Sequence, residues 1–269
     1  MTTPPTETYV HGHHASVLRS HGWRTAENSA AYLLPHLRPD QRLLDVGTGP
    51  GSITVDFAHR LSAGSVTGID NAAAAVEATR NLATREGVPV EATVGDVYAL
   101  DFPNEHFDVV HAHQVLQHLA DPVAALAGMR RVCRPGGMVA ARDADYAAMT
   151  WFPASPGLDR WLELYRSLAR AGGGEPDAGR RLRSWALAAG FAEVTSSASV
   201  WCFASAEDVA WWTRTWAERV TASTFAEQAT ALGLSDAEEL AELARAWRAW
   251  GDQPDAWFSV LHGEVLARR

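Results

Sequence analysis

Lysine is absent from this chain, and all 23 basic side chains are arginine. This absence excludes chemistry that needs a lysine amine, namely Schiff-base formation, pyridoxal phosphate attachment and the Gly-Lys-Ser/Thr phosphate loop. Cysteine is scarce, because only Cys133 and Cys202 occur. Two thiols cannot build a disulfide framework or a four-thiolate zinc site. Both lie in apolar sequence contexts, so we expect them to be reduced and buried.

Basic residues are also fewer than acidic ones, and long apolar runs are absent from the sequence. The 23 basic residues face 32 acidic ones, which gives a formal charge of −9, and no run of arginines would make a basic groove. This balance argues against a nucleic-acid partner, which needs a broad cationic surface. No apolar stretch reaches the roughly 18–20 residues of a membrane span. The start MTTPPTETYVHGHH lacks the basic and apolar regions of a secretory signal. We therefore expect a cytoplasmic protein with no membrane partner.

The length of 269 residues and the hydrophobic content of 47% are sufficient for a substantial core. Short apolar runs predict strands at residues 42–46, 65–69, 90–94, 107–112 and 138–142. Helices are predicted between them, at residues 52–61, 72–86 and 122–133. Asp121 and Pro122 mark the start of the last helix, as a cap and a first-turn proline. This alternation indicates βαβ units around a parallel sheet.

The segments on either side of this alternation differ from it. Before it, apolar residues at three- and four-residue steps predict a helix from Thr25 to Pro39; they are Ala26, Ala30, Leu33, Leu34 and Leu37. After it, ten of the eleven tryptophans lie beyond residue 150, with predicted strands at 194–203 and 257–266 and helices within 206–250. We expect a single α/β domain over residues 1–269, with a Rossmann-like, doubly wound, mostly parallel sheet and helices on both faces. Its parts are an N-terminal helical lid (1–39), a core (40–142) and a C-terminal helical insertion that completes the sheet (143–269).

The most informative segment is the glycine-rich run Leu43–Gly51. Gly47, Gly49 and Gly51 lie between a predicted strand and a predicted helix, where backbone without Cβ atoms can approach a ligand closely. A dinucleotide-binding fold needs glycine at position 52, and Ser52 occupies it. The spacing is therefore Gly-x-Gly-x-Gly, which leans away from NAD.

This run, LLDVGTGPG, resembles the first motif of the class I S-adenosylmethionine-dependent methyltransferases, in particular the small-molecule, quinone-type members (methyltransferase type 11). Three further positions agree in order: Asp70 closes the second strand, Gly95-Asp96-Val97 follows the third, and the blocks at 107–122 and 134–137 resemble the fourth-strand region and its successor. The resemblance implies that Asp70 accepts hydrogen bonds from both ribose hydroxyls of the cofactor. It also implies that Asp96 reads the adenine amino group while Val97 covers the ring.

The resemblance makes residues 40–142 the cofactor-binding core and S-adenosyl-L-methionine the cofactor. The cofactor contacts that it implies come from Asp45, Gly47, Thr48, Gly49, Gly51, Asp70, Asn71, Gly95, Asp96, Val97, His113, Gln114 and Arg24. Arg24 lies in a stretch loosely similar to the segment that covers the cofactor in quinone-type C-methyltransferases. By that analogy its guanidinium pairs with the cofactor's carboxylate. The alternative, an arginine solvated on a capping helix, stays open.

Where this chain departs from the motifs of particular family branches, the departures argue against the methyl acceptors of those branches. After the fourth strand, members that methylate adenine or glutamine amides carry Asp/Asn-Pro-Pro-Tyr/Phe, whereas this chain reads His113–Leu116. Arsenite methyltransferases need several cysteines, whereas this chain has two. Catechol-type members bind a metal near the fourth and fifth strands, but Asp143 and Asp145 have no third carboxylate or asparagine in register. The histidines at 111, 113 and 118 do not make the converging, supported set that zinc requires. We therefore expect no metal.

His113 is the candidate catalytic residue, because imidazole titrates near neutral pH and the residue follows the fourth strand, where cofactor and substrate should meet. The alternative is that His113 only shapes the pocket. Side chains predicted to line an apolar substrate site are Tyr9, His13, Tyr146, Trp151, Trp201 and Trp211. Their rings could also offer π-faces to the sulfonium of the cofactor.

These observations predict an S-adenosylmethionine-dependent methyltransferase that acts on a small, partly apolar or aromatic molecule by direct in-line transfer, as a monomer or homodimer. Carbon, oxygen and nitrogen acceptors fit equally. Two alternatives remain. One is a cofactor-binding protein of this fold that does not methylate. The other is an NAD-dependent oxidoreductase, which would share the ribose contact of Asp70.

Overall fold

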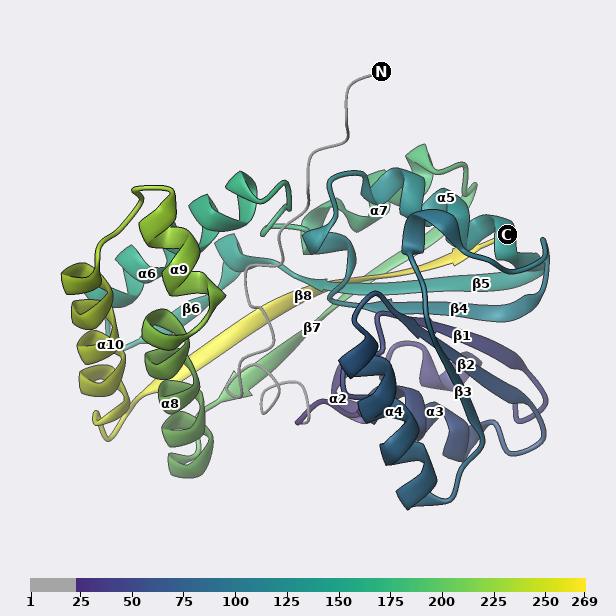
Figure 1. Ribbon diagram of the computed structural model, residues 1–269, viewed down its shortest axis with the longest axis horizontal. Coiled ribbons are helices and arrows are strands. Elements are labelled where there is room, and N and C mark those ends of the chain that lie inside the picture. Colours follow the sequence, from purple (N-terminus) through teal and green to yellow (C-terminus); the bar gives the residue numbers. More distant parts are fainter. Residues whose placement is uncertain (1–22) are drawn as a thin grey trace.

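A mixed sheet runs through the centre of the computed structural model, which describes residues 23–269 (Figure 1). Its strands are β1 (Arg42–Val46), β2 (Ser65–Asp70), β3 (Val90–Val94), β4 (Phe107–His113), β5 (Cys133–Ala144), β6 (Thr150–Phe152), β7 (Glu193–Phe203) and β8 (Trp257–Arg268). The first five are parallel, in the order β3-β2-β1-β4-β5. β8 is antiparallel to β5, and β7 and β6 pair with β8. This arrangement confirms the predicted doubly wound, mostly parallel sheet.

Helices cover both faces of the parallel part, as Figure 1 shows. On one face lie α2 (Ala26–Ser29), α3 (Ser52–Arg60) and α4 (Ala73–Glu86), and on the other lie α5 (Pro122–Val132) and α7 (Leu182–Ala188). Alternate strand residues point to opposite faces, so Leu43 packs under α3 while Leu44 packs under α5. The predicted cap of α5 is confirmed, because the Asp121 carboxylate accepts a hydrogen bond from the amide of Ala124 at 2.9 Å.

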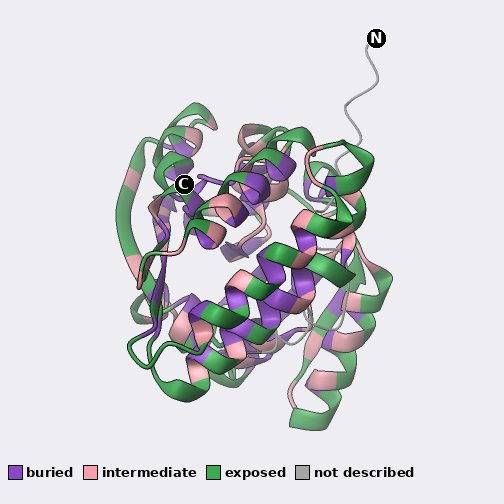
Figure 2. Cartoon of the chain, turned by 90° about the vertical axis from the view of Figure 1, so that its left-hand side faces the viewer, coloured by how far each residue is buried: buried purple, intermediate pink, exposed green. Residues whose placement is uncertain are grey.

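A second core fills the other end of the molecule. Here α6 (Pro156–Ala171), α8 (Ala206–Ala222), α9 (Thr224–Ala231) and α10 (Ala237–Gly251) gather beside β6 and the neighbouring ends of β7 and β8 (Figure 1). Their inward faces are buried and their outward faces exposed (Figure 2). Trp161 lies at the centre, with its ring centroid 4.4 Å from that of Trp216 and 4.9 Å from that of Trp247. No helix among residues 23–269 combines the length and apolarity needed to span a membrane.

Two expectations from the sequence are wrong. The predicted helix from Thr25 to Pro39 is only the four-residue α2 followed by a 3₁₀ turn, Leu34–His36. Pro35 explains the break, because its ring clashes with a helical backbone and it lacks an amide hydrogen. Cys133 is buried as expected, but Cys202 is exposed. On β7 the neighbours Trp201 and Phe203 point inward, so Cys202 must point outward.

The aromatic core leads to a test of stability. Replacing Trp161 by alanine is expected to lower the free energy of unfolding by about 3–5 kcal/mol, because the ring is fully buried and its removal leaves a cavity. Trp257→Ala is the matched control, because that side chain is 37% exposed and should cost about 1 kcal/mol. Urea unfolding followed by circular dichroism measures both variants. Equal losses in the two would show that the ring cluster does not hold this end of the fold together.

Candidate active site

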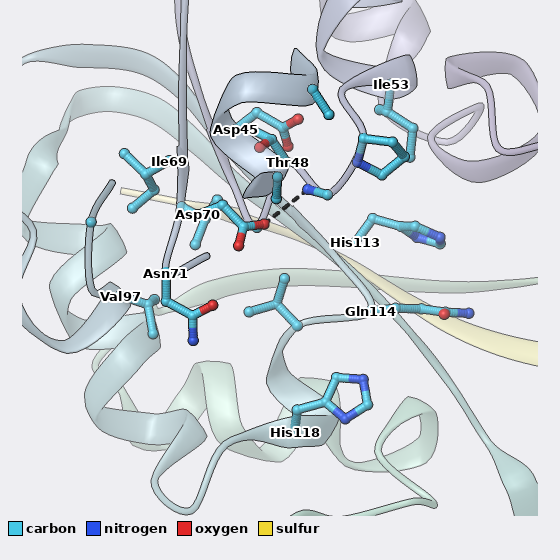
Figure 3. A pocket seen from close by; sticks show the side chains of 18 of the residues that line it. Asp45, Thr48, Ile53, Ile69, Asp70, Asn71, Val97, His113, Gln114 and His118 are labelled. Atoms are coloured by element: carbon cyan, nitrogen blue, oxygen red, sulfur yellow. Dashed lines mark hydrogen bonds between the residues drawn. The ribbon is translucent and has the colours of Figure 1, made fainter. Parts of the chain in front are cut away.

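A cavity of about 400 Å³ opens at the carboxyl ends of β1, β2 and β4 (Figure 3). The strand order reverses here, since β2 and β3 follow on one side of β1 while β4 lies on the other. The loops that leave such neighbouring strands diverge to opposite faces and leave a crevice between them. The cavity is lined by the loop after β1, by the ends of β2 and β4, by the segment after β3 and by Arg24.

The glycine loop forms one wall, and its backbone conformation requires glycine. Gly47 and Gly51 have φ angles of +75° and +90°, which disfavour other residues. A Cβ on Gly47 would lie 2.4 Å from Val115, and one on Gly51 would lie 2.7 Å from the Cα of Thr79. Gly51 thus allows α4 to pack against the loop. Of the predicted cofactor residues, Gly51 alone is not on the cavity lining.

Asp70 ends β2 at the edge of the cavity. One carboxylate oxygen accepts a hydrogen bond from the amide of Gly49 at 2.9 Å, drawn as a dashed line in Figure 3, and the other accepts from the amide of Ala72 at 3.0 Å. These bonds hold the carboxylate beside the glycine loop. Each oxygen keeps capacity to accept a further hydrogen bond. Asn71 lies next to it on the lining.

The far side of the cavity is built by the turn after β3. Gly95, Asp96 and Val97 all line it. The Asp96 side chain accepts from the amide of Tyr98 at 2.9 Å and so caps a short 3₁₀ turn. Val97 is buried and presents an apolar surface, whereas Asp96 is exposed. A carboxylate beside an apolar wall is able to bind the polar edge and the face of a flat ring.

Asp45 lies near the end of β1, just before the glycine loop, and holds it in place through buried hydrogen bonds. It is 3% exposed, and its two oxygens accept from Thr54 Oγ1 at 2.5 Å and from His111 Nδ1 at 2.7 Å. Both oxygens of Asp45 are therefore already engaged inside the protein. Thr48, the other predicted residue of the loop, lines the cavity.

His113 and Gln114 follow at the end of β4, on the side of the cavity that faces β8 (Figure 3). His113 is 6% exposed, and neither ring nitrogen has a hydrogen-bond partner in the described part of the chain. Burial, reinforced by the guanidinium groups of Arg142 and Arg24, holds the pKa of His113 well below its usual value of 6.5. The ring is therefore neutral at physiological pH.

Gln114 links three segments through its side chain. Its amide oxygen accepts from Arg24 Nη2 at 2.6 Å, and its amide nitrogen lies 2.8 Å from Nε2 of His262. His262 Nδ1 is 3.1 Å from the carbonyl of Val260 and donates to it, so Nε2 is left to accept from Gln114. Burial holds the pKa of His262 well below its usual value, in agreement with this neutral form. Arg24 is thus placed on the cavity wall.

The predicted substrate residues that the structure describes share one aromatic cluster, that of the second core, which lies beside the cavity. Trp201 lies beside His113, with 5.7 Å between ring centroids, and Trp211 lies 5.7 Å from Trp23. Tyr146 stacks on Tyr165 and Trp151 stacks on Phe258, inside the second core. None of these four lines the cavity. Tyr9 and His13 lie outside the described residues.

Several residues of the site were missed by sequence reasoning. His118, considered from the sequence as a metal ligand, lines the cavity, and burial lowers its pKa to about 3. Ile53 and Ala78 line it from the helices that follow the first two strands, and such small and apolar side chains carry no sequence signal of their own. Among residues 23–269 no three His, Cys, Asp or Glu side chains are grouped as metal ligands would be. Asp145, considered for such a role, is paired with Arg180 at 2.6 Å.

Comparison with known proteins gives the cavity its context. Residues 43–137 match a family model described as a methyltransferase domain. Over 97% of its length this chain is 35% identical to an uncharacterized methyltransferase of Schizosaccharomyces pombe, of which the match covers 96%. Over 36% of its length it is 34% identical to a ubiquinone/menaquinone biosynthesis C-methyltransferase of Bdellovibrio bacteriovorus, of which the match covers 42%.

The fold comparison agrees. The YcgJ protein of Bacillus subtilis superposes with a TM-score of 0.59 over 89% of this chain and 97% of that protein, at 18% sequence identity. Identity this low shows a shared fold, whereas the relative from Schizosaccharomyces pombe shares sequence from end to end. The chain therefore belongs to the class I S-adenosylmethionine-dependent methyltransferase family.

Proposed function

We propose that this protein binds S-adenosyl-L-methionine in the cavity beside the glycine loop and transfers its methyl group to a small, partly apolar or aromatic molecule. The observation that carries this proposal is the Asp70 carboxylate, which two backbone amides hold at the cavity edge with acceptor capacity to spare. Charge-assisted hydrogen bonds from a pair of ribose hydroxyls suit such a group. Membership of the family supports the same cofactor.

The lining residues fit this cofactor in their chemistry. Asp70 and Asn71 would hold the ribose, and Asp96 with Val97 would hold the adenine. Gly47 and Gly49 allow the backbone close to the methionine part. Arg24 bonds Gln114 after β4, on the opposite side of β1 from β3, which Asp96 follows, and its guanidinium would pair there with the cofactor's carboxylate. Its place on the cavity wall favours this role over a solvated one.

When bound, the cofactor supplies a methyl group on a positively charged sulfur. The protein's own part is to hold the acceptor in line with that methyl group, at roughly 3–3.5 Å, and to exclude water. His113 is neutral and on the lining, so one ring nitrogen is able to accept a hydrogen bond from an acceptor hydroxyl and orient it, while the low pKa makes the ring a weak base. Where the acceptor atom carries no proton, His113 acts as a wall of the site. Gln114, the next residue, is held in position by its bonds to Arg24 and His262.

The wider setting is proposed on composition alone. A charge of −9 and the absence of an arginine run support small-molecule substrates over nucleic acid. We propose a cytoplasmic protein without a membrane partner that works as a monomer or homodimer.

The role of Asp70 is directly testable. Asp70→Ala removes the acceptor of the ribose bonds and should weaken S-adenosylmethionine binding by about tenfold or more, the equivalent of ~1.4 kcal/mol or more. Isothermal titration calorimetry of the full chain measures the affinity. Asp101→Ala is the matched control, because this aspartate is exposed and is not on the lining. Unchanged affinity in Asp70→Ala would count against both the site and the cofactor.

The ionisation of His113 gives a second test. Because its pKa is held well below 6.5, the folded protein keeps this ring neutral as the pH falls from 8 through 6.5, whereas the unfolded chain takes up a proton there. The His113 ring resonance, assigned by its loss in His113→Gln, is therefore expected not to titrate between about pH 5.5 and 8. The urea-unfolded protein serves as the reference. A midpoint near 6.5 in the folded state would contradict the buried, neutral base.

A further inference from the structure

A row of polar side chains, buried except at its outer end, crosses the sheet next to the cavity. His113 on β4 is paired in register with Arg142 on β5, Arg142 with Glu264 on β8, and Glu264 with Ser197 on β7. Paired residues of adjacent strands point to the same face. His113, Arg142 and Glu264 are each at most 6% exposed. His113 also lines the cavity, so it is the wall shared by the cavity and this polar row.

The first residues of the described chain lie over the row. The indole of Trp201 on β7 donates to the carbonyl of Asn28 at 2.7 Å, and Trp23 packs edge-on against the same indole, with centroids 5.2 Å apart. The hydroxyl of Tyr32 is buried too. Residues 23–32 thus cover the buried part of the row, whereas its outer end at Ser197 is exposed.

Arg142 uses only part of its hydrogen-bonding capacity inside the protein. Its Nε donates to Ser199 Oγ at 3.0 Å and to Glu264 Oε1 at 3.3 Å. Its two terminal nitrogens, Nη1 and Nη2, are buried and have no hydrogen-bond partner within residues 23–269. The guanidinium carbon lies 4.9 Å from the centroid of Trp201, so the plane is supported from one side. Burying a charged fork with its outer donors unused is unfavourable unless a ligand takes them.

Two further side chains near Arg142 also carry buried polar atoms that have no hydrogen-bond partner elsewhere in the described chain. The hydroxyl of Tyr32 and both ring nitrogens of His113 have no partner among the described residues. Burial raises the pKa of Tyr32 above its usual value, so this hydroxyl keeps its proton and is able to donate. The neutral imidazole of His113 has one nitrogen that donates.

The carboxylates near Arg142 are not available to its outer nitrogens. Glu264 accepts from Ser197, Ser199 and Arg142 Nε. Asp45 is engaged by Thr54 and His111. Burial raises the pKa of Asp143 to about 8, so this group is protonated at neutral pH. Arg142 itself stays charged, because burial lowers its pKa only to about 10.

On this basis, and resting on the methyl transfer proposed above, we propose that the acceptor molecule carries a carboxylate, which the outer nitrogens of Arg142 bind with help from Tyr32 and His113. The planar guanidinium fork matches two carboxylate oxygens in a bidentate geometry. Trp201 and Trp23 supply an apolar surface for the rest of the molecule. A carboxylate suits these few donors better than a phosphate, whose additional oxygens and charge would need more of them. Arg142 is then a specificity-determining residue.

Pairs of small probes that differ only in charge test this proposal. Benzoate, phenylacetate and 3-phenylpropionate are each titrated by calorimetry against their primary amides, into the full chain saturated with S-adenosylhomocysteine. We expect at least one acid to bind about ten- to a hundredfold more tightly than its amide, as loss of charge-assisted bonds implies. If every acid binds no better than its amide, or if inorganic phosphate competes as strongly as the acids, the proposal is overturned.

Three variants show whether Arg142 is responsible. Arg142→Met alone would leave Glu264 as an unpaired buried charge, so it is combined with Glu264→Gln, which removes both charges together. The single variant Glu264→Gln leaves Arg142 charged without its ion-pair partner, so its urea midpoint of unfolding is measured beside its binding; while folded it should keep the preference for acids, whereas the double variant should lose it. Tyr32→Phe should weaken acid binding severalfold without lowering the urea midpoint of unfolding, because the hydroxyl has no partner to lose. A double variant that binds acids as well as Glu264→Gln would overturn the assignment.

Binding of S-adenosylhomocysteine to each variant separates the two proposals. If the cofactor product binds and the acids show no preference dependent on Arg142, the carboxylate site is wrong and the methyltransferase proposal stands. If the product fails to bind the wild-type chain while the acids still prefer Arg142, the carboxylate site stands and the methyltransferase proposal fails.

Discussion

The hydrogen bond from the Gly49 amide to the Asp70 carboxylate ties the loop after β1 to the end of β2. The amides of Gly47 and Thr48 also donate to the carbonyl of Ile69, at 2.8 and 3.1 Å, so three hydrogen bonds together fix the loop against the end of β2 and set the width of the cavity. The same loop is supported from below, where Asp45 is bonded to Thr54 of α3 and His111 of β4. A ligand in this cavity therefore meets a preorganised wall and need not order it, which lowers the entropic cost of binding.

Toward the carboxyl ends of the parallel strands, one face of the sheet changes from apolar to polar. Leu43, Val109 and Met138 pack under α3 on the face that, further along, carries Arg142 and Glu264. A buried ion pair contributes little to the free energy of unfolding, and a buried guanidinium whose outer donors have no partner lowers it. The fold has a large aromatic core at its other end, around Trp161, that is able to offset such a cost. The large aromatic core thus lies in the helical insertion, and the buried polar groups lie where that insertion joins the parallel sheet.

Much of the fold was readable because its signals are local. The apolar run at 42–46 predicted β1, and the Asp121–Pro122 cap predicted the start of α5. Both signals lie within the element that they predict, and both elements are present. Errors came where a single residue overrides a pattern, as Pro35 does in the expected helix. The polar row beside His113 was not predicted, because its members come from separate strands and only the pairing register brings them together. The available signals were two charged residues, Arg142 and Glu264, inside predicted strands.

The turn that joins the cavity to the polar row is under strain. Gln114 has a φ angle of +53°, a left-handed conformation that costs a residue with a Cβ roughly 1–2 kcal/mol. Its amide donates to the carbonyl of Arg142 at 2.7 Å, and its side chain bonds Arg24 and His262, which offsets that cost. The strained backbone therefore directs one side chain across to the N-terminal segment and holds Arg142 beside His113. Arg24 lines the cavity and Arg142 belongs to the row, so the bonds of this one residue join the cavity wall to the buried polar groups beside it.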